Sequence, residues 1–142
     1  MRKPIYIFLL LLFSAGSFAQ PQPTPSIALD TFKGLPKEID GCAETCSYKD
    51  TPLKEEKYIW ITNLQELGMI KVSGKVIHLH RVSHAASGKN YKDVYKGGGY
   101  VIVSRMKEVK ETGDEESYMT GTLEISYGGK VATFIIHGTA GC

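Results

Sequence analysis

Proline is confined to the first 52 residues of this chain, and this distribution constrains the fold more than any other feature. All six prolines fall at or before Pro52, and none occurs between Leu53 and Cys142. Proline lacks the backbone N–H that a β-ladder requires, so a long proline-free stretch suits hydrogen-bonded strands. No long helical period interrupts the stretch. We therefore expect an all-β fold.

A two-residue turn near the C-terminus predicts the pairing of two strands. Gly128-Gly129 separates two apolar–polar alternating runs, and both glycines can adopt the positive φ of a tight hairpin turn. This turn sets Ile125 opposite Ala132 and Leu123 opposite Phe134. The apolar faces of the two strands then coincide, so the turn and the pattern predict the same register.

A second hairpin is expected at Ser73-Gly74, where the turn sets Ile70 opposite Ile77. Further strands are predicted at residues 57–62 and 99–109, and a single helical turn at residues 63–67. Several short strands joined by tight turns favour a small, mostly antiparallel β-barrel. We predict about six to eight strands within residues 41–142.

The N-terminus has the pattern of an export signal. Arg2 and Lys3 precede an apolar run at residues 5–13, and small residues up to Ala19 form a cleavage-site pattern. Nine apolar residues are too few to span a bilayer, which needs about 20. We expect a signal peptide at 1–19, a proline-rich linker at 20–40, and a periplasmic or secreted domain without a membrane span.

Loss of the signal peptide changes the charge balance. The whole chain has 17 basic and 15 acidic residues, and removal of Arg2 and Lys3 leaves the two kinds equal in number. Nucleic-acid binding requires a basic surface that displaces counterions from phosphates. A nucleic-acid partner is therefore not expected.

Three cysteines in an exported protein predict one disulfide, because the compartments outside the cytoplasm are oxidising. A bridge from Cys42 or Cys46 to Cys142 would join the start of the domain to its end. We favour Cys46–Cys142, with Cys42–Cys46 as a lesser alternative. Either long bridge leaves an odd cysteine that is free, buried or paired between chains.

The histidines could form a metal site, but ordinary surface histidines are favoured. His78 and His80 share one face of a predicted strand, and His84 follows shortly after. The hairpin register turns the first two away from the apolar face. No acid is identifiable to orient His84 for hydrolase chemistry, so neither catalysis nor a cofactor is expected. Trp60 is interpreted as a core residue.

One segment stands out as a candidate binding loop. Residues 83–99 combine small residues, three lysines, two tyrosines and a triple glycine between two predicted strands. Long connections between strands are often functional.

The order of motifs around this loop resembles the C-type lysozyme inhibitor family of small exported bacterial β-barrels. The resemblance rests on a cysteine before the first strand, a Gly-Lys strand, a Ser-Gly-x-x-Tyr loop, a Lys-Gly pair and a C-terminal cysteine. These motifs correspond to Cys46, residues 74–79, Ser87-Gly88-Lys89-Asn90-Tyr91, Lys96-Gly97 and Cys142. The second half also resembles small secreted Bacteroidota proteins of unassigned function.

The resemblance implies that a loop serine and a later lysine enter a lysozyme cleft and engage its catalytic carboxylates. These roles would fall on Ser87 and Lys96, with Gly88 and Tyr91 completing the loop motif. Our first hypothesis is therefore a non-enzymatic exported binding protein whose 83–99 loop contacts a partner such as a lysozyme. The second hypothesis is a barrel that binds a small ligand or metal in its interior or at its histidines.

Overall fold

The computed structural model of this chain describes residues 27–142. The expected signal peptide and the proline-rich residues 20–26 lie outside this range. Within residues 27–142, no helix has the length and hydropathy needed to cross a bilayer. One short 3-10 helix, η1, spans Leu53–Glu55, and strands make up most of the remaining structure.

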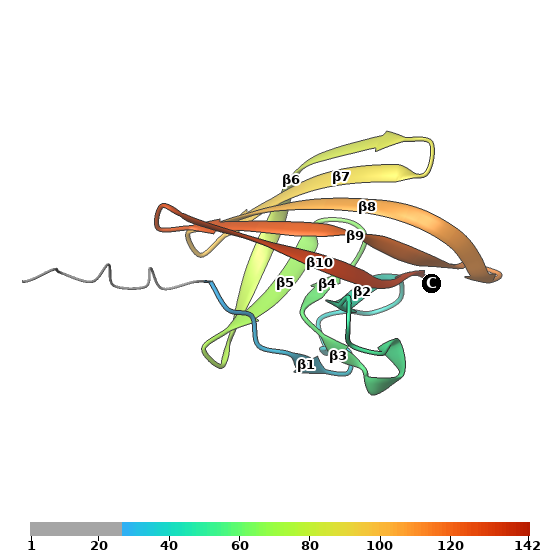
Figure 1. Ribbon diagram of the computed structural model, residues 1–142, viewed down its shortest axis with the longest axis horizontal. Helices are drawn as coiled ribbons and strands as arrows, with labels where there is room; N and C mark the ends of the chain where they lie inside the picture. Colours follow the sequence, from blue (N-terminus) through green and yellow to red (C-terminus); the bar gives the residue numbers. More distant parts are fainter. Residues whose placement is uncertain (1–26) are drawn as a thin grey trace, which may run out of the picture.

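Eight of the ten strands in residues 27–142 close into one antiparallel barrel (Figure 1). Around the barrel the order is β10, β2, β4, β5, β6, β7, β8, β9, and β9 pairs again with β10. The remaining two strands, β1 and β3, form a small separate sheet. The prediction of a small all-β barrel is confirmed. The strands span Phe32–Lys33 (β1), Ala43–Tyr48 (β2), Lys57–Tyr58 (β3), Trp60–Thr62 (β4), Leu67–Val72 (β5), Lys75–Ser87 (β6), Asn90–Gly97 (β7), Tyr100–Gly113 (β8), Glu116–Tyr127 (β9) and Lys130–Gly141 (β10).

Both predicted hairpin registers are confirmed. Between β9 and β10, Ile125 pairs with Ala132 and Leu123 with Phe134. Gly128 and Gly129 have φ values of 57° and 75°, which supply the tight turn. Between β5 and β6, Ile70 pairs with Ile77 as expected.

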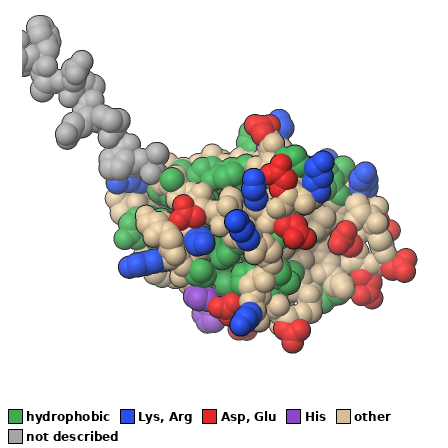
Figure 2. Space-filling view, turned by 90° about the horizontal axis from the view of Figure 1, so that it is seen from below, with side chains coloured by type: hydrophobic (Ala, Val, Ile, Leu, Met, Phe, Trp, Pro, Cys, Tyr) green, Lys and Arg blue, Asp and Glu red, His purple; other side chains and the backbone are tan. Residues whose placement is uncertain are grey.

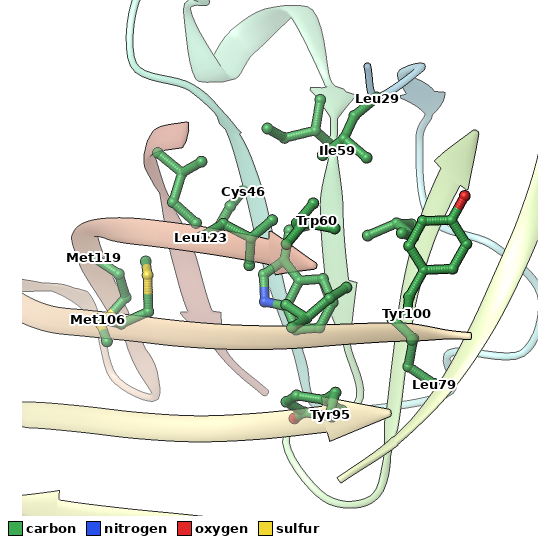
Figure 3. Close-up of a cluster of buried hydrophobic side chains, with 14 residues drawn as sticks. Leu29, Cys46, Ile59, Trp60, Leu79, Tyr95, Tyr100, Met106, Met119 and Leu123 are labelled. Atoms are coloured by element: carbon green, nitrogen blue, oxygen red, sulfur yellow. The ribbon is translucent and has the colours of Figure 1, made fainter. Parts of the chain in front are cut away.

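The barrel interior holds the main hydrophobic core. Trp60 is fully buried, as predicted, and its ring packs edge-to-face on Tyr95 with the centroids 5.0 Å apart (Figure 3). Gly68 on β5 makes room for this pair, because a Cβ at that position would lie 2.7 Å from the Trp60 ring. The other fully buried side chains of this cluster include Cys46, Ile59, Ile70, Ile102, Leu123 and Ile125.

A second core lies outside the barrel wall and changes the expected domain boundary. Ile61 and Met69 face outward from β4 and β5, and Phe32 and Ile39 cover them. Leu29 joins the main core. The predicted linker is therefore wrong over residues 27–40, because these apolar side chains pack on the barrel despite the neighbouring prolines.

The disulfide joins Cys42 to Cys142, so the predicted Cys46–Cys142 pairing is wrong. The register between β2 and β10 pairs Ala43 with Gly141, which brings the two cysteines that flank this pair together with 4.0 Å between their Cα atoms. Cys46 is paired with Gly138 further along the ladder, and its thiol is fully buried in the core.

Residues 63–67 do not form the predicted helical turn. The Asn63 side-chain oxygen accepts hydrogen bonds from the backbone N–H groups of Gln65 and Leu67, each at 3.0 Å. Leu64 has a φ of 59°, outside the helical region, and donates its N–H to the Thr62 hydroxyl. Side-chain capping of this kind competes with helix formation.

The predicted 83–99 loop is a β-hairpin. Strand β6 continues to Ser87, a tight turn follows at Gly88 and Lys89, and β7 returns from Asn90 to Gly97. Only the end of the triple glycine forms a connection, with φ values of 57° at Gly98 and 83° at Gly99. In Figure 1 this hairpin, drawn in yellow-green to yellow, lies at the top of the fold above β8.

Candidate ligand-binding site

The structure separates the two residues to which the family resemblance assigns a shared role. Ser87 is exposed at the tip of the β6–β7 hairpin, where it pairs with Asn90. Lys96 lies six residues further along β7 and is also exposed. At about 3.3 Å per residue, roughly 20 Å separates the two positions along the strand. Gly88 forms the turn, with a φ of 59°.

Tyr91, the last residue of the Ser-Gly-x-x-Tyr motif, belongs to a different feature. It lines a cavity of about 270 Å³ at one mouth of the barrel. Seven of the eight barrel strands contribute to its wall, and Leu64 adds to the wall from the β4–β5 connection. The lining residues are Glu44, Thr62, Leu64, Arg81, His84, Tyr91, Asp93, Tyr95, Glu108, Ser117, Met119, Ala140 and Gly141.

A β-bulge in β6 brings two basic side chains into this cavity. The register shifts between Arg81, which pairs with Tyr95, and Ser83, which pairs with Val94. The extra residue, Val82, reverses the alternation, so Arg81 and His84 both line the cavity although three positions separate them. The bulge therefore sends His84 to the face opposite the one expected for a regular strand.

Asp93 on β7 is the acid that the sequence did not reveal as a partner for His84. The His84 Nδ1 atom lies 2.6 Å from Asp93 Oδ1, and the Arg81 guanidinium lies 3.7 Å from the same oxygen. Arg81 also donates to the Leu64 carbonyl at 3.4 Å. Asp93 is thus held between two basic side chains.

Glu44 on β2 is the most deeply buried carboxyl group of the cavity. Only 8% of the residue is exposed, and Trp60 donates its indole N–H to Glu44 Oε1 at 3.0 Å. Burial raises the pKa of Glu44 from its usual 4.5 to about 7, and the negative charge of Asp93 adds to this rise. The Trp60 hydrogen bond acts in the opposite direction. Glu44 was not singled out from the sequence.

The remaining polar wall comes from β7 and β8. Tyr95 is 2% exposed, and burial raises its pKa to about 12, so its hydroxyl stays protonated at physiological pH. Glu108 on β8 lines the cavity, and the Lys89 ammonium lies 3.9 Å from its carboxylate. Met119 on β9 supplies apolar surface beside these groups.

The three candidate metal ligands do not converge. His78 and His80 pair across the ladder with Met69 and Leu67 on the outer face, whereas His84 lines the cavity. The nearest acid to His78 is Glu38, at 3.6 Å. In residues 27–142, no group of three histidine, cysteine or acidic side chains is arranged to hold a metal ion.

The face drawn in Figure 2 carries both basic and acidic side chains, and several of the acidic ones gather at its right-hand end. After residue 19 the chain has equal numbers of the two kinds. Together, the fold and the cavity define a small closed antiparallel barrel with an ionisable cluster at one mouth. Comparisons with protein-family models, with curated proteins and with solved structures found no match. The resemblance to lysozyme inhibitors stays a prediction.

Proposed function

We propose that this protein is an exported, non-enzymatic binding protein that holds a small molecule in the mouth cavity. The observation that carries the proposal is the convergence of five acidic or basic side chains on one cavity. Each comes from a barrel strand, and each faces the cavity: Glu44, Arg81, His84, Asp93 and Glu108.

The composition of the wall favours a ligand rather than a structural core. Ligand sites combine apolar and aromatic surface with a few directed polar groups, and the mouths of β-barrels are frequent locations for them. Here Tyr91, Tyr95 and Met119 supply the apolar part. A volume of about 270 Å³ lies at the lower limit of drug-sized pockets, so the ligand is expected to be small.

Burial of Glu44 is costly for the fold, and this cost also favours a binding role. A buried carboxylate without a cationic partner destabilises a protein, and a well-packed apolar residue would be tolerated better. Strongly shifted pKa values are frequent at functional sites. The raised pKa of Glu44 together with its place in the cavity wall is the pattern expected for a ligand-contacting group.

Export is part of the proposal. The sequence of residues 1–19 has the pattern of a signal peptide. The Cys42–Cys142 disulfide is compatible with an oxidising compartment, where such bonds persist.

Native mass spectrometry of the protein isolated from the exported fraction of its producing cells tests the proposal. We expect a stoichiometric organic adduct on the folded protein. Ala140→Phe, which fills the cavity from β10, should abolish the adduct. Thr139→Phe is the matched control, because adjacent residues of a strand point to opposite faces. An apo mass for the wild type, or equal adduct in both variants, would contradict the proposed site.

A protein partner of the lysozyme type is the second candidate. It is favoured by the β6–β7 hairpin, which lies at the edge of the fold in Figure 1. Ser87 is exposed beside the turn of this hairpin. If this candidate is right, micromolar mature protein should slow C-type lysozymes, and replacing Ser87 and Lys96 together with alanine should abolish the effect. Lys130→Ala, on β10 away from this hairpin, should leave it intact. Unchanged rates across several C-type lysozymes would rule out this partner.

A further inference from the structure

The charges of the mouth cavity are unevenly neutralised. Asp93 has both Arg81 and His84 as partners, and Glu108 forms an ion pair with Lys89 at 3.9 Å. Glu44 takes part in no ion pair within residues 27–142. In the described part of the chain, the one side-chain hydrogen bond of Glu44 comes from the Trp60 indole N–H and occupies Oε1. A carboxyl group that is more than nine-tenths buried therefore lines the cavity without a cation.

We propose that the ligand of the mouth cavity is a small organic cation whose ammonium group pairs with Glu44. This inference rests on the proposed function, because it names the ligand class of the same site. An ammonium group would supply the cationic partner that Glu44 lacks. Charge-assisted hydrogen bonds are roughly twice as strong as hydrogen bonds between neutral groups.

The aromatic residues of the cavity fit the same class of ligand. Tyr91 and Tyr95 both line the same cavity as Glu44. Tyrosine rings attract cations through the negative face of the ring, and desolvated cation–aromatic contacts are the strongest. A cation with an apolar body would thus find both a carboxylate and aromatic surface in one cavity.

An anionic ligand fits the cavity less well. It would meet the carboxyl groups of Glu44, Asp93 and Glu108. The one arginine is already engaged, since Arg81 contacts Asp93 and donates to the Leu64 carbonyl. Releasing it would leave the partly buried Asp93 with one partner fewer, which is unfavourable.

Binding of a cation at Glu44 should depend on pH, because a protonated carboxyl group no longer attracts it. With a pKa of about 7, Glu44 is about 3% ionised at pH 5.5 and almost fully ionised at pH 8.5. The affinity should therefore fall roughly 30-fold on acidification. The other titratable or charged groups around Glu44 are Cys46 on β2, Arg81 and His84 on β6, Tyr91, Asp93 and Tyr95 on β7, and Glu108 on β8.

Three probes of the same shape but different charge test the inference on the wild-type protein. We would titrate benzylammonium, benzyl alcohol and benzoate at pH 8.5 and follow the backbone amides by NMR. Benzylammonium should bind at least tenfold more tightly than the alcohol, benzoate should be weakest, and the shifted amides should belong to the cavity wall. The benzylammonium affinity should then fall roughly 30-fold at pH 5.5.

The Glu44→Gln variant tests whether the preference for benzylammonium and its pH dependence come from the Glu44 side chain. Glutamine keeps an oxygen that can accept the Trp60 hydrogen bond but carries no charge. The variant should lose at least tenfold in benzylammonium affinity and most of the pH dependence. Glu124→Gln is the matched control, since Glu124 pairs with Arg105 outside the cavity.

The outcomes separate this inference from the function on which it rests. If benzoate or the alcohol binds as tightly as benzylammonium and shifts the same cavity amides, the cation assignment is wrong but the cavity remains a ligand site. An unchanged affinity in folded Glu44→Gln has the same meaning. If none of the three probes at millimolar concentration shifts a cavity amide, both proposals are overturned.

Discussion

Replacing Cys42 and Cys142 together with alanine should lower the free energy of unfolding by about 4–5 kcal/mol. The disulfide closes a loop with a sequence separation of 100 residues. In the chain-entropy model a loop of this length restricts the unfolded chain by about 4.7 kcal/mol, and native disulfides of small secreted domains contribute about 2–5 kcal/mol. Urea unfolding of the oxidised wild type and the double variant measures this difference.

The control for this prediction is Cys46→Ala, which removes the third cysteine without opening the loop. Cys46 is fully buried, so its removal leaves a small cavity, and we expect a loss of about 1 kcal/mol. The unfolded wild type should contain one thiol that reacts with a thiol reagent. A Cys46→Ala protein as unstable as the double variant would contradict the Cys42–Cys142 assignment.

Between pH 4.5 and pH 8.5, the free energy of unfolding of the wild type should fall by about 3 kcal/mol more than that of Glu44→Gln. Burial raises the pKa of Glu44 from 4.5 to about 7 in the folded protein. The folded state therefore holds this proton more tightly than the unfolded state does. As the pH rises from 4.5 through 7, the wild type must ionise a buried carboxyl group, and its stability falls.

Chemical unfolding of the wild type and Glu44→Gln at both pH values checks the sign and the size of this effect. The wild type should lose stability relative to the variant as the pH rises. Glu124→Gln, whose carboxyl lies outside the cavity, should follow the wild type. Parallel stability profiles for wild type and Glu44→Gln would show that Glu44 keeps an ordinary pKa in the folded protein.

The pairing of adjacent strands could be predicted from the sequence where a tight turn and an alternating pattern agreed. Gly128-Gly129 and Ser73-Gly74 each set a register that the structure has. Contacts between segments far apart in the sequence could not be predicted in this way. The Cys42–Cys142 bond depends on how β2 meets β10, and these strands are far apart in the sequence. The packing of residues 27–40 depends on an outward apolar patch that exists only once β4 and β5 are paired.

Most of the cavity could not be predicted from the sequence, because its charged residues lie on different strands. Tyr91 and His84 were among the candidate residues, but for other roles. Glu44, Asp93 and Glu108 each look like ordinary solvent-facing residues in isolation, and barrel closure alone brings them together. The bulge at Val82 adds one residue to β6, and a shift of one residue reverses every side chain that follows.

An NMR screen of several hundred small soluble fragments tests the central claim most directly. The amides shifted by bound fragments would be mapped onto the barrel without any prior choice of ligand. We predict that the hits cluster on the cavity wall, around Glu44, Arg81, Tyr91 and Asp93. Hits confined to the Ser87 hairpin tip or the outer face, with the cavity amides unchanged, would contradict the claim that this protein binds a small molecule in its barrel mouth.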